Sequence, residues 1–301
     1  MWLRFLVPPE AQGMPLRNFL HACAVSTELT RAVKYQGGGF FLDGKPVHTN
    51  ILLGAGQTAA FELPPEQSCA VRPQPALAEG LRIVYEDALA VVLDKPAGIA
   101  VHPTLNYPDG TLANAWSAWA QARGESGVFR PVNRLDKNTS GLLLAARNMY
   151  AAPLLAGSAE KQYIAIAEGE LPLGAGVFDA PIGRRGDSII GRCVTPDGKP
   201  SRTEYTVEQA KDGLSLAVCR PVTGRTHQIR VHFSAAGHPL AGDTLYGGDT
   251  ARIARHALHC GRMTFLEPVY EADAQGLTFS VPLRYRTVST SADLPPDMKI
   301  L

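Results

Sequence analysis

Short strand-like segments fill the chain from residue 82 onward, and they limit the folds that it can adopt. RIVYED, ALAVVLDKP, YIAIAEG, TEYTVEQA and LSLAVCRPV are alternating or apolar, and the last two are joined across Lys211, Asp212 and Gly213. Two helical stretches, TLANAWSAWAQAR and HQIRVHFSAAG, lie between strands. Runs of hairpins with few helices predict an α+β fold on a mixed, mainly antiparallel sheet.

A smaller α+β unit is predicted over residues 13–66. It contains two helical segments, PLRNFLHAC and STELTRAVKYQGG, then the hairpin FFLDGKPVHT, which turns at Asp43 and Gly44, and the strand TAAFELP. The next segment is rich in proline and lacks a hydrophobic period. Residues 67–78 are therefore predicted to be a stiff linker, and residues 79–301 the main domain.

Composition sets limits on the class of protein. The 301 residues carry 29 basic against 28 acidic side chains, so the net charge does not mark a nucleic-acid binder. The stretch 182–202 has five basic and two acidic residues. It is either a phosphate-binding track or a solvated loop.

The cysteines and the apolar runs indicate a reduced cytoplasmic setting. Five scattered cysteines with no CxxC spacing argue against a disulfide framework. No run approaches the roughly 18 apolar residues of a membrane helix. Metal-ligand spacing and nucleotide-binding loops are also absent, so we expect no metal and no cofactor.

One carboxylate, Asp136, stands in the segment PVNRLDKNTSGLLLAAR (residues 131–147), just before a buried run. Arg134 and Lys137 lie on either side of it. Taken alone, such an acid is best interpreted as the cap of a turn above a core strand. Two later segments change that interpretation. EKQYIAIAEG places Tyr163 at the head of a strand, and RPVTGRTHQIRVHFSAAGHPLAGDTLYGG gathers Arg, His and Gly around a helix start.

These segments, in this order, resemble the large-subunit-type (RluA-like) family of pseudouridine synthases. The likeness covers roughly residues 80–300 and rests on several ordered motifs: RLDxxTSGLLLxA, KxYxA and GRTHQIRVHF followed by HPLAGDTLYGG, with DKPAGIAVHP, APIGR, GKPSRTEY and ALH. The family commonly has His where this chain has Asn133. The unit at residues 13–66 is similar to the S4 fold, although the first 70 residues hold five basic and five acidic side chains.

The resemblance implies an isomerase that converts uridines of ribosomal or transfer RNA to pseudouridine without a cofactor. The N1–C1′ bond breaks and C5 is joined to C1′. By resemblance Asp136 is the catalytic carboxylate, which attacks C1′, attacks C6 or stabilises charge. Arg230 is its buried cationic partner, and Tyr163 offers an aromatic face and a phenolic oxygen.

The remaining implied site residues bind the RNA substrate. The uridine must leave its stack, and Arg134 is the expected wedge in the vacated space. Ile229 would contact the base by its apolar side chain. The residues before the second helical stretch, Gly224, Arg225, Thr226 and His227, suit a phosphate or simply cap the helix.

Two other functions remain to be distinguished from this one. A catalytically silent RNA-binding or RNA-folding protein has no need of a desolvated acid with a dedicated arginine. A nucleoside hydrolase requires a second carboxylate, and the motifs offer Asp136 alone. The expected partner is RNA, with no membrane and no small-molecule cofactor, and the protein is expected to be a monomer.

Overall fold

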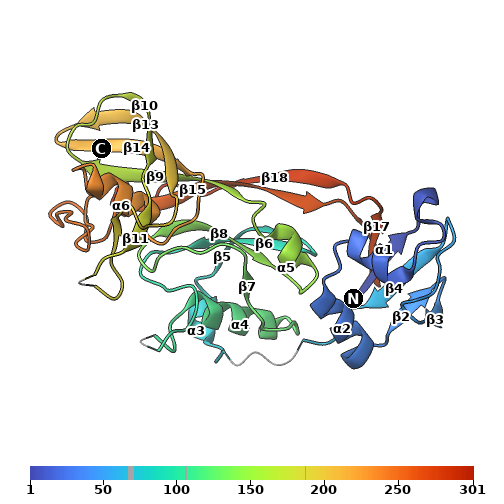
Figure 1. Ribbon diagram of the computed structural model, residues 1–301. Coiled ribbons are helices and arrows are strands. Elements are labelled where there is room, and N and C mark those ends of the chain that lie inside the picture. Colours follow the sequence, from blue (N-terminus) through green and yellow to red (C-terminus); the bar gives the residue numbers. More distant parts are fainter. Residues whose placement is uncertain (67–70, 106, 187) are drawn as a thin grey trace.

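The computed structural model describes residues 1–66, 71–105, 107–186 and 188–301. Two units lie side by side, and a long ribbon made by β15 (Leu258–Pro268) and β18 (Tyr285–Ser291) extends from the larger toward the smaller (Figure 1). The larger unit is a mixed, mainly antiparallel sheet with helices beside it, which confirms the predicted fold class.

Ten strands form the principal sheet within the described residues. Their order is β10-β13-β14-β9-β15-β8-β6-β5, with β18 paired to β15 and β7 to β8. The remaining strands are β5 (Arg82–Glu86), β6 (Ala90–Lys95), β7 (Arg130–Pro131), β8 (Ser140–Ala146), β9 (Glu160–Glu168), β10 (Gly174–Asp179), β13 (Arg202–Lys211) and β14 (Leu214–Pro221). A separate hairpin consists of β11 (Ile182–Arg184) and β12 (Arg192–Val194).

The described helices are short, and none is both long and apolar enough to cross a membrane. In the larger unit they are α3 (Pro75–Ala78), α4 (Leu112–Ala122), α5 (Ala151–Leu155), α6 (Gln228–Ala235) and the 3₁₀ turn η2 (Pro296–Met298). Helix α4 begins with a capping box, in which Thr111 and Asn114 bond each other's backbone N–H groups.

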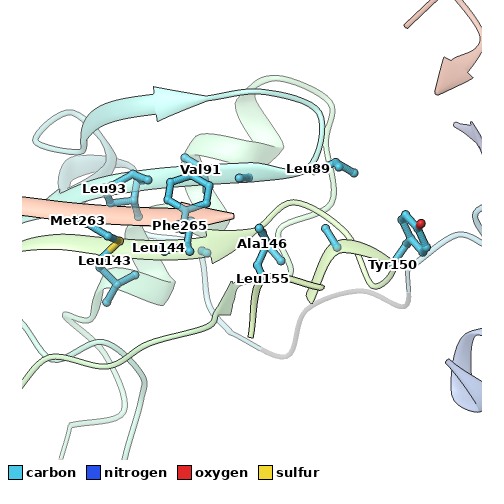
Figure 2. Close-up of a cluster of buried hydrophobic side chains, with 14 of the residues drawn as sticks. Leu89, Val91, Leu93, Leu143, Leu144, Ala146, Tyr150, Leu155, Met263 and Phe265 are labelled. Atoms are coloured by element: carbon cyan, nitrogen blue, oxygen red, sulfur yellow. The ribbon is translucent and has the colours of Figure 1, made fainter. Parts of the chain in front are cut away.

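The centre of the sheet is a continuous apolar core. Every residue of β8 is buried, and Val91 and Leu93 of β6 are inaccessible to solvent. Figure 2 shows these side chains gathered with Leu144, Met263 and Phe265. Each such side chain contributes about 1.5–3 kcal/mol by burial, so β8 is a firm base for the turn that precedes it.

Gly141 allows β8 and β15 to pair in parallel. Its φ is +103°, and a Cβ built on it would lie 2.3 Å from the carbonyl oxygen of Cys260 on β15. No side chain fits between the two backbones at that distance. The glycine of the TSG motif is therefore required by strand packing, five residues from Asp136.

Gly141→Ala is expected to lower the free energy of unfolding by roughly 3 kcal/mol or more, because backbone strain and backbone overlap combine. Urea denaturation measures the change. Gly213→Ala is the matched control: Gly213 also has a positive φ, +73°, but open space around its Cβ position. There we expect only about 1–2 kcal/mol. Equal losses at the two positions would contradict the packing argument.

The smaller unit contains the two expected helices and the expected hairpin. The helices are α1 (Leu16–Ala22) and α2 (Thr27–Gln36), preceded by the 3₁₀ turn η1 (Pro9–Ala11). Strands β2 (Phe40–Leu42) and β3 (Lys45–Val47) turn at Asp43 and Gly44, both with positive φ. Ser26 caps α2 by accepting the N–H of Leu29 at 3.1 Å.

The sheet of the smaller unit also contains residues from the two ends of the chain. Its order is β16-β17-β1-β4-β2-β3, formed by β1 (Trp2–Leu6), β4 (Thr58–Glu62), β16 (Glu271–Ala272) and β17 (Gly276–Ser280) as well as the hairpin. Strand β1 pairs in parallel with β17. The division into 13–66, 67–78 and 79–301 did not anticipate this pairing, because contact between distant strands leaves no local sequence pattern.

Aromatic side chains join the two units. Tyr150, at the start of α5, packs its ring against Phe5 of β1 and Phe279 of β17. Its hydroxyl donates to the carbonyl of Cys23 at 3.0 Å. The ring is inaccessible to solvent. The units therefore share one apolar core, and the smaller one is fixed against the larger rather than tethered to it.

The expected linker is only partly irregular. Its first residues, 67–70, lie outside the described part of the chain. Residues Pro75–Ala78 form α3, where the proline at the first helical position is already in the required conformation. The backbone before α3 is attached to α4 by a hydrogen bond from Gln74 N–H to the carbonyl of Asn114, 3.2 Å. This end of the segment belongs to the larger unit.

Candidate active site

Asp136 lies on the turn from β7 to β8. Two backbone hydrogen bonds close the turn. The N–H of Thr139 donates to the carbonyl of Asp136 at 3.1 Å, and the N–H of Val132 donates to the carbonyl of Leu144 at 2.9 Å. The Asn133 side chain continues this ladder, since its Oδ1 accepts the N–H of Leu144 at 2.7 Å. An acceptor at position 133 thus fixes the turn to the buried strand β8.

This contact explains how Asn133 can stand where the family that this chain resembles commonly has His. The unprotonated ring nitrogen of a neutral histidine is also an acceptor, so Asn133→His is expected to keep stability, and the isomerisation that the resemblance implies, within a few-fold. Asn133→Leu has a similar size but leaves the Leu144 N–H unpaired, at a cost of about 1–3 kcal/mol. Chemical denaturation and single-turnover assays of both variants test this. A leucine variant as stable as the histidine one would refute the role of the acceptor.

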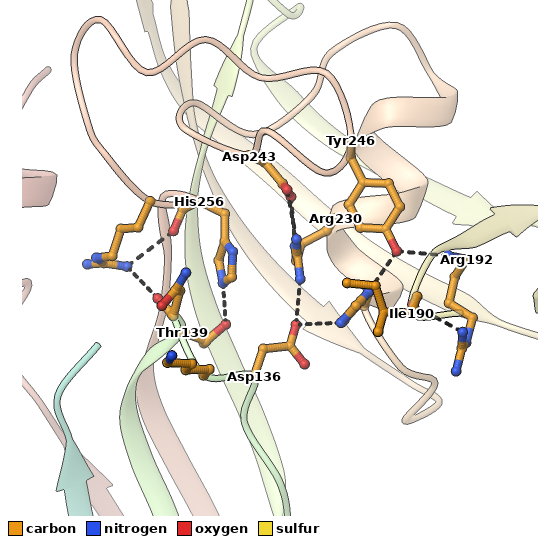
Figure 3. Close-up of polar contacts among 12 residues, drawn as sticks. Asp136, Thr139, Ile190, Arg192, Arg230, Asp243, Tyr246 and His256 are labelled. Carbon is orange, nitrogen blue, oxygen red and sulfur yellow. Dashed lines mark hydrogen bonds and ion pairs between the residues drawn. The ribbon is translucent and has the colours of Figure 1, made fainter. Parts of the chain in front are cut away.

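Arg230 binds Asp136 from α6. Its Nη1 donates to Asp136 Oδ2 at 3.0 Å, while Nε and Nη2 each donate to a different oxygen of Asp243 at 2.7 Å (Figure 3). Arg230 and Asp243 are buried. The bidentate pair with Asp243 holds the guanidinium plane, and the third nitrogen orients Asp136.

The charges around Asp136 keep it ionised. Burial alone would raise the pKa of this carboxyl, but His227, Arg230 and His256 outweigh burial and hold the pKa below its ordinary value. Burial lowers the pKa of His227 and brings that of His256 to about 4. Both imidazoles are neutral at pH 7 and carry positive charge only at the acid pH at which Asp136 itself titrates, so at pH 7 Arg230 is the charged partner in contact with Asp136.

Tyr163 lies on β9 and faces the same space. The side chain is 8% exposed, and burial raises the pKa of its hydroxyl well above 10. The phenol therefore stays protonated. It presents an aromatic surface and a neutral O–H group next to an ionised acid.

A second chain of contacts runs from Asp136 to the β11–β12 hairpin. His227 Nε2 lies 3.7 Å from Asp136 Oδ2, and His227 Nδ1 shares a 2.7 Å hydrogen bond with the hydroxyl of Tyr246. That hydroxyl accepts the backbone N–H of Arg192 at 3.0 Å (Figure 3). His227 has a positive φ of 58°, a strained conformation that recurs at functional sites.

All nine residues expected at the site line one cavity of about 300 Å³, here named the first cavity. Asp136 lines it beside three buried residues, Tyr163, Arg230 and Ile229, and Arg134 is the exposed member of this set. Its remaining expected members are Gly224, Arg225, Thr226 and His227. The volume lies at the lower end of the range for small-ligand sites and suits one nucleoside.

The segment before α6 is a helix N-terminus, as expected. His227 occupies the cap position, without a side-chain bond to the helix backbone. The N–H of Arg225 is already bonded to Gln228 Oε1 at 3.0 Å, and Gln228 also accepts from Thr223. The Arg225 amide, one of those expected to bind a phosphate, is therefore already bonded within the protein. Phosphate binding by this segment remains a prediction.

Sequence reasoning missed three polar residues around Asp136: Asp243, Tyr246 and His256. The first two stand in the quoted motif HPLAGDTLYGG, and an acid and a tyrosine there were a usable signal. The Arg230 guanidinium lies 4.9 Å from the Tyr246 ring centre. His256 Nε2 contacts Thr139 Oγ1 at 2.8 Å, which supports the turn from its other side (Figure 3).

Comparison with known proteins gives the family to which the chain belongs. A sequence family described as RNA pseudouridylate synthase matches residues 90–235. An uncharacterized RNA pseudouridine synthase, YjbO of Bacillus subtilis (strain 168), is 35% identical over 278 residues, which cover 90% of this chain and 95% of the relative. The chain belongs to the RNA pseudouridine synthase family.

Other members of the RNA pseudouridine synthase family extend the likeness. Ribosomal large subunit pseudouridine synthase D of Xanthomonas campestris pv. campestris is 35% identical over 256 residues, 78% of this chain and 75% of that protein. Among solved structures, human RNA pseudouridylate synthase domain containing 1 has a TM-score of 0.56 and 27% identity, over 74% of this chain and 87% of that one. This synthase is accordingly an isomerase that makes pseudouridine in RNA.

Proposed function

We propose that Asp136 is the catalytic carboxylate of this synthase. The observation that carries the proposal is the 3.0 Å contact of its Oδ2 with buried Arg230, a contact between two residues that both line the first cavity. The other oxygen, Oδ1, receives no hydrogen bond from any described residue and is the atom free to react. An ionised carboxylate that is oriented through one oxygen and free at the other can attack a uridine or stabilise the charge that develops on the uridine as its glycosidic bond breaks.

Tyr163 and Ile229 hold the uracil in this proposal. Both side chains line the first cavity and are more than nine-tenths buried. An aromatic ring and an aliphatic side chain exclude water from the two faces of a base. The protonated Tyr163 hydroxyl offers a neutral hydrogen bond as the base is released and rotated, without adding charge near Asp136.

Positive charge free for RNA phosphates is present around the cavity. Arg134, Lys137, Lys161 and Arg225 surround the cavity region and form no ion pair with any described residue, whereas many arginines elsewhere in the described chain are paired. Arg202, one of the five basic residues of the stretch 182–202, is paired with Asp179 and Glu204. The local distribution of cations therefore supports RNA binding despite the near-zero net charge.

Arg134 is the proposed wedge during base flipping. It lies two residues before Asp136, at the rim, with its side chain exposed. A uridine that enters the cavity leaves a gap in its stack, which costs a few kcal/mol. The planar guanidinium can fill that gap and contact a phosphate at once.

The substrate we propose is a uridine of large-subunit ribosomal RNA. Several relatives carry the name ribosomal large subunit pseudouridine synthase D, and one of them is 35% identical to this chain. Pseudouridine mapping of total RNA, from cells with and without the gene, tests the proposal. We expect one or a few large-subunit positions to lose the modification and to regain it with the wild-type gene but not with Asp136→Asn. Loss confined to transfer RNA would refute the proposed substrate.

We further propose that the enzyme is a cytoplasmic monomer, in which the smaller unit, residues 13–66 together with strands β1, β16 and β17, is S4-like and the rest of residues 79–301 is the catalytic unit. Free thiols at Cys23, Cys193, Cys219 and Cys260 support a reducing compartment. Sedimentation of the purified protein tests the oligomeric state, and cell fractionation tests the compartment.

A further inference from the structure

A second cavity, of about 830 Å³, adjoins the first one. Six residues line both cavities: Val132, Asn133, Arg134, Leu135, Asp136 and His227. The turn that carries Asp136 is thus the wall between two spaces. The second cavity is too large for the uridine alone. It is lined by Asp136, the carboxylate proposed to react with the uridine.

The lining of the second cavity suits a nucleotide. Lys137 and Arg134 bring positive charge, and Asp136 is its only carboxylate among the described residues. Tyr107 and His102 bring aromatic surface. Burial and the neighbouring Arg134 lower the pKa of His102, which is therefore a neutral ring at pH 7. Aromatic faces with nearby cations bind bases by stacking and phosphates by charge.

Tyr107 is held where a base could stack on it. Its N–H donates to the carbonyl of Thr104 at 3.0 Å and its carbonyl accepts the N–H of Thr104 at 2.9 Å, so the backbone of Tyr107 is held by two hydrogen bonds. The Lys137 ammonium lies 3.9 Å from the ring centre and covers one face. The residue is 46% exposed. The uncovered face can receive a planar group, and Ile190 of the β11–β12 connection supplies apolar surface to the same cavity.

We propose that the second cavity binds the nucleotide that adjoins the target uridine, with its base stacked on Tyr107 and its phosphate near Arg134 and Lys137. The inference rests on the proposed function, in which the uridine occupies the first cavity. Only one phosphate separates the two nucleotides, so the neighbour must lie close to Asp136, and the second cavity is the space that adjoins it. Stacking accepts every base, so this subsite adds affinity more than sequence selection.

The test compares uridine 5′-monophosphate with the trinucleotide UpUpU in NMR titrations of the full-length protein. Stacking of one base is expected to make UpUpU bind about 5- to 100-fold more tightly. Tyr107→Ala should remove most of this gain and leave the affinity for the monophosphate unchanged. Tyr107→Phe should retain it. A trinucleotide with abasic outer positions keeps the phosphates and should lose the gain with wild-type protein.

Tyr35→Ala is the matched control, because Tyr35 is also exposed and also lies beside a lysine, with Lys34 Nζ 5.2 Å from its ring centre, but on α2. In Tyr35→Ala, UpUpU should bind more tightly than uridine 5′-monophosphate by the same factor as in the wild-type protein. An undiminished gain in Tyr107→Ala, or equal loss in Tyr35→Ala, would overturn the subsite. The assay contains no ribosomal RNA, so an incorrect choice of substrate RNA would appear in the pseudouridine map and leave this comparison intact.

Discussion

Asp136→Asn is expected to reduce isomerisation by about 10⁴-fold or more while the fold and the RNA affinity persist. The amide has nearly the size of the carboxylate but neither its charge nor its nucleophilicity. The fold should survive because Arg230 keeps its two 2.7 Å bonds to Asp243, so the variant leaves no buried cation without a partner. Single-turnover pseudouridine formation, RNA binding and urea denaturation measure the three properties.

Asp212→Asn is the control for this variant. Asp212 is an exposed turn residue with positive φ, a conformation that asparagine adopts readily, and it lies outside the site. Its activity should match wild type. Substantial pseudouridine formation by Asp136→Asn would show that another group performs the chemistry and that Asp136 is not the reactive residue of the first cavity.

Arg230→Ala is expected to cost both stability and activity. The change leaves Asp136 and Asp243 facing each other without their shared cation, and loss of one partner from a buried ion pair costs about 3–5 kcal/mol. The pKa of Asp136 should rise, since Arg230 is one of the groups that lower it. We expect turnover to fall by about 100-fold or more.

A double variant separates the two effects. In Arg230→Ala combined with Asp243→Asn, the uncompensated carboxylate at 243 is removed, so the free energy of unfolding should recover toward wild type. Turnover should stay low because Asp136 still lacks its orienting group. Recovery of turnover together with stability would mean that Arg230 serves the fold alone. Arg230→Lys offers a single ammonium group to both Asp136 and Asp243. Its free energy of unfolding and its turnover should therefore lie between those of wild type and of the alanine variant.

The turns and strands of this enzyme could be predicted from short stretches of its sequence. Asp136 sits between turn residues and a buried strand, and the hairpin turn at Asp43 and Gly44 follows from the backbone conformations of those two residues. Motif resemblance then chose Tyr163 and Arg230 from many tyrosines and arginines, and these side chains line the same cavity as Asp136. Their catalytic roles stay predictions until the variants are measured.

Contacts between distant segments were beyond sequence reasoning. Asp243 lies 13 residues from Arg230 along the chain, and nothing in local periodicity says that its carboxylate reaches the guanidinium. The same holds for the link from Tyr246 to the backbone of Arg192. The pairing of β1 with β17 is the extreme case, because each strand reads as an ordinary apolar segment and the register between them has no signature.

The position of β17 between β1 and β16 has a consequence for the order of events during synthesis. The ribosome releases β1 long before its parallel neighbour at residues 276–280, because the whole larger unit up to β15 lies between them along the chain. Until then one edge of β1 has no neighbour, and Phe5 lacks the Phe279 ring that stacks on it, 5.3 Å between centroids. The smaller unit, although most of its residues precede the larger unit along the chain, is therefore expected to reach its native form only after the strands of the larger unit have been synthesised.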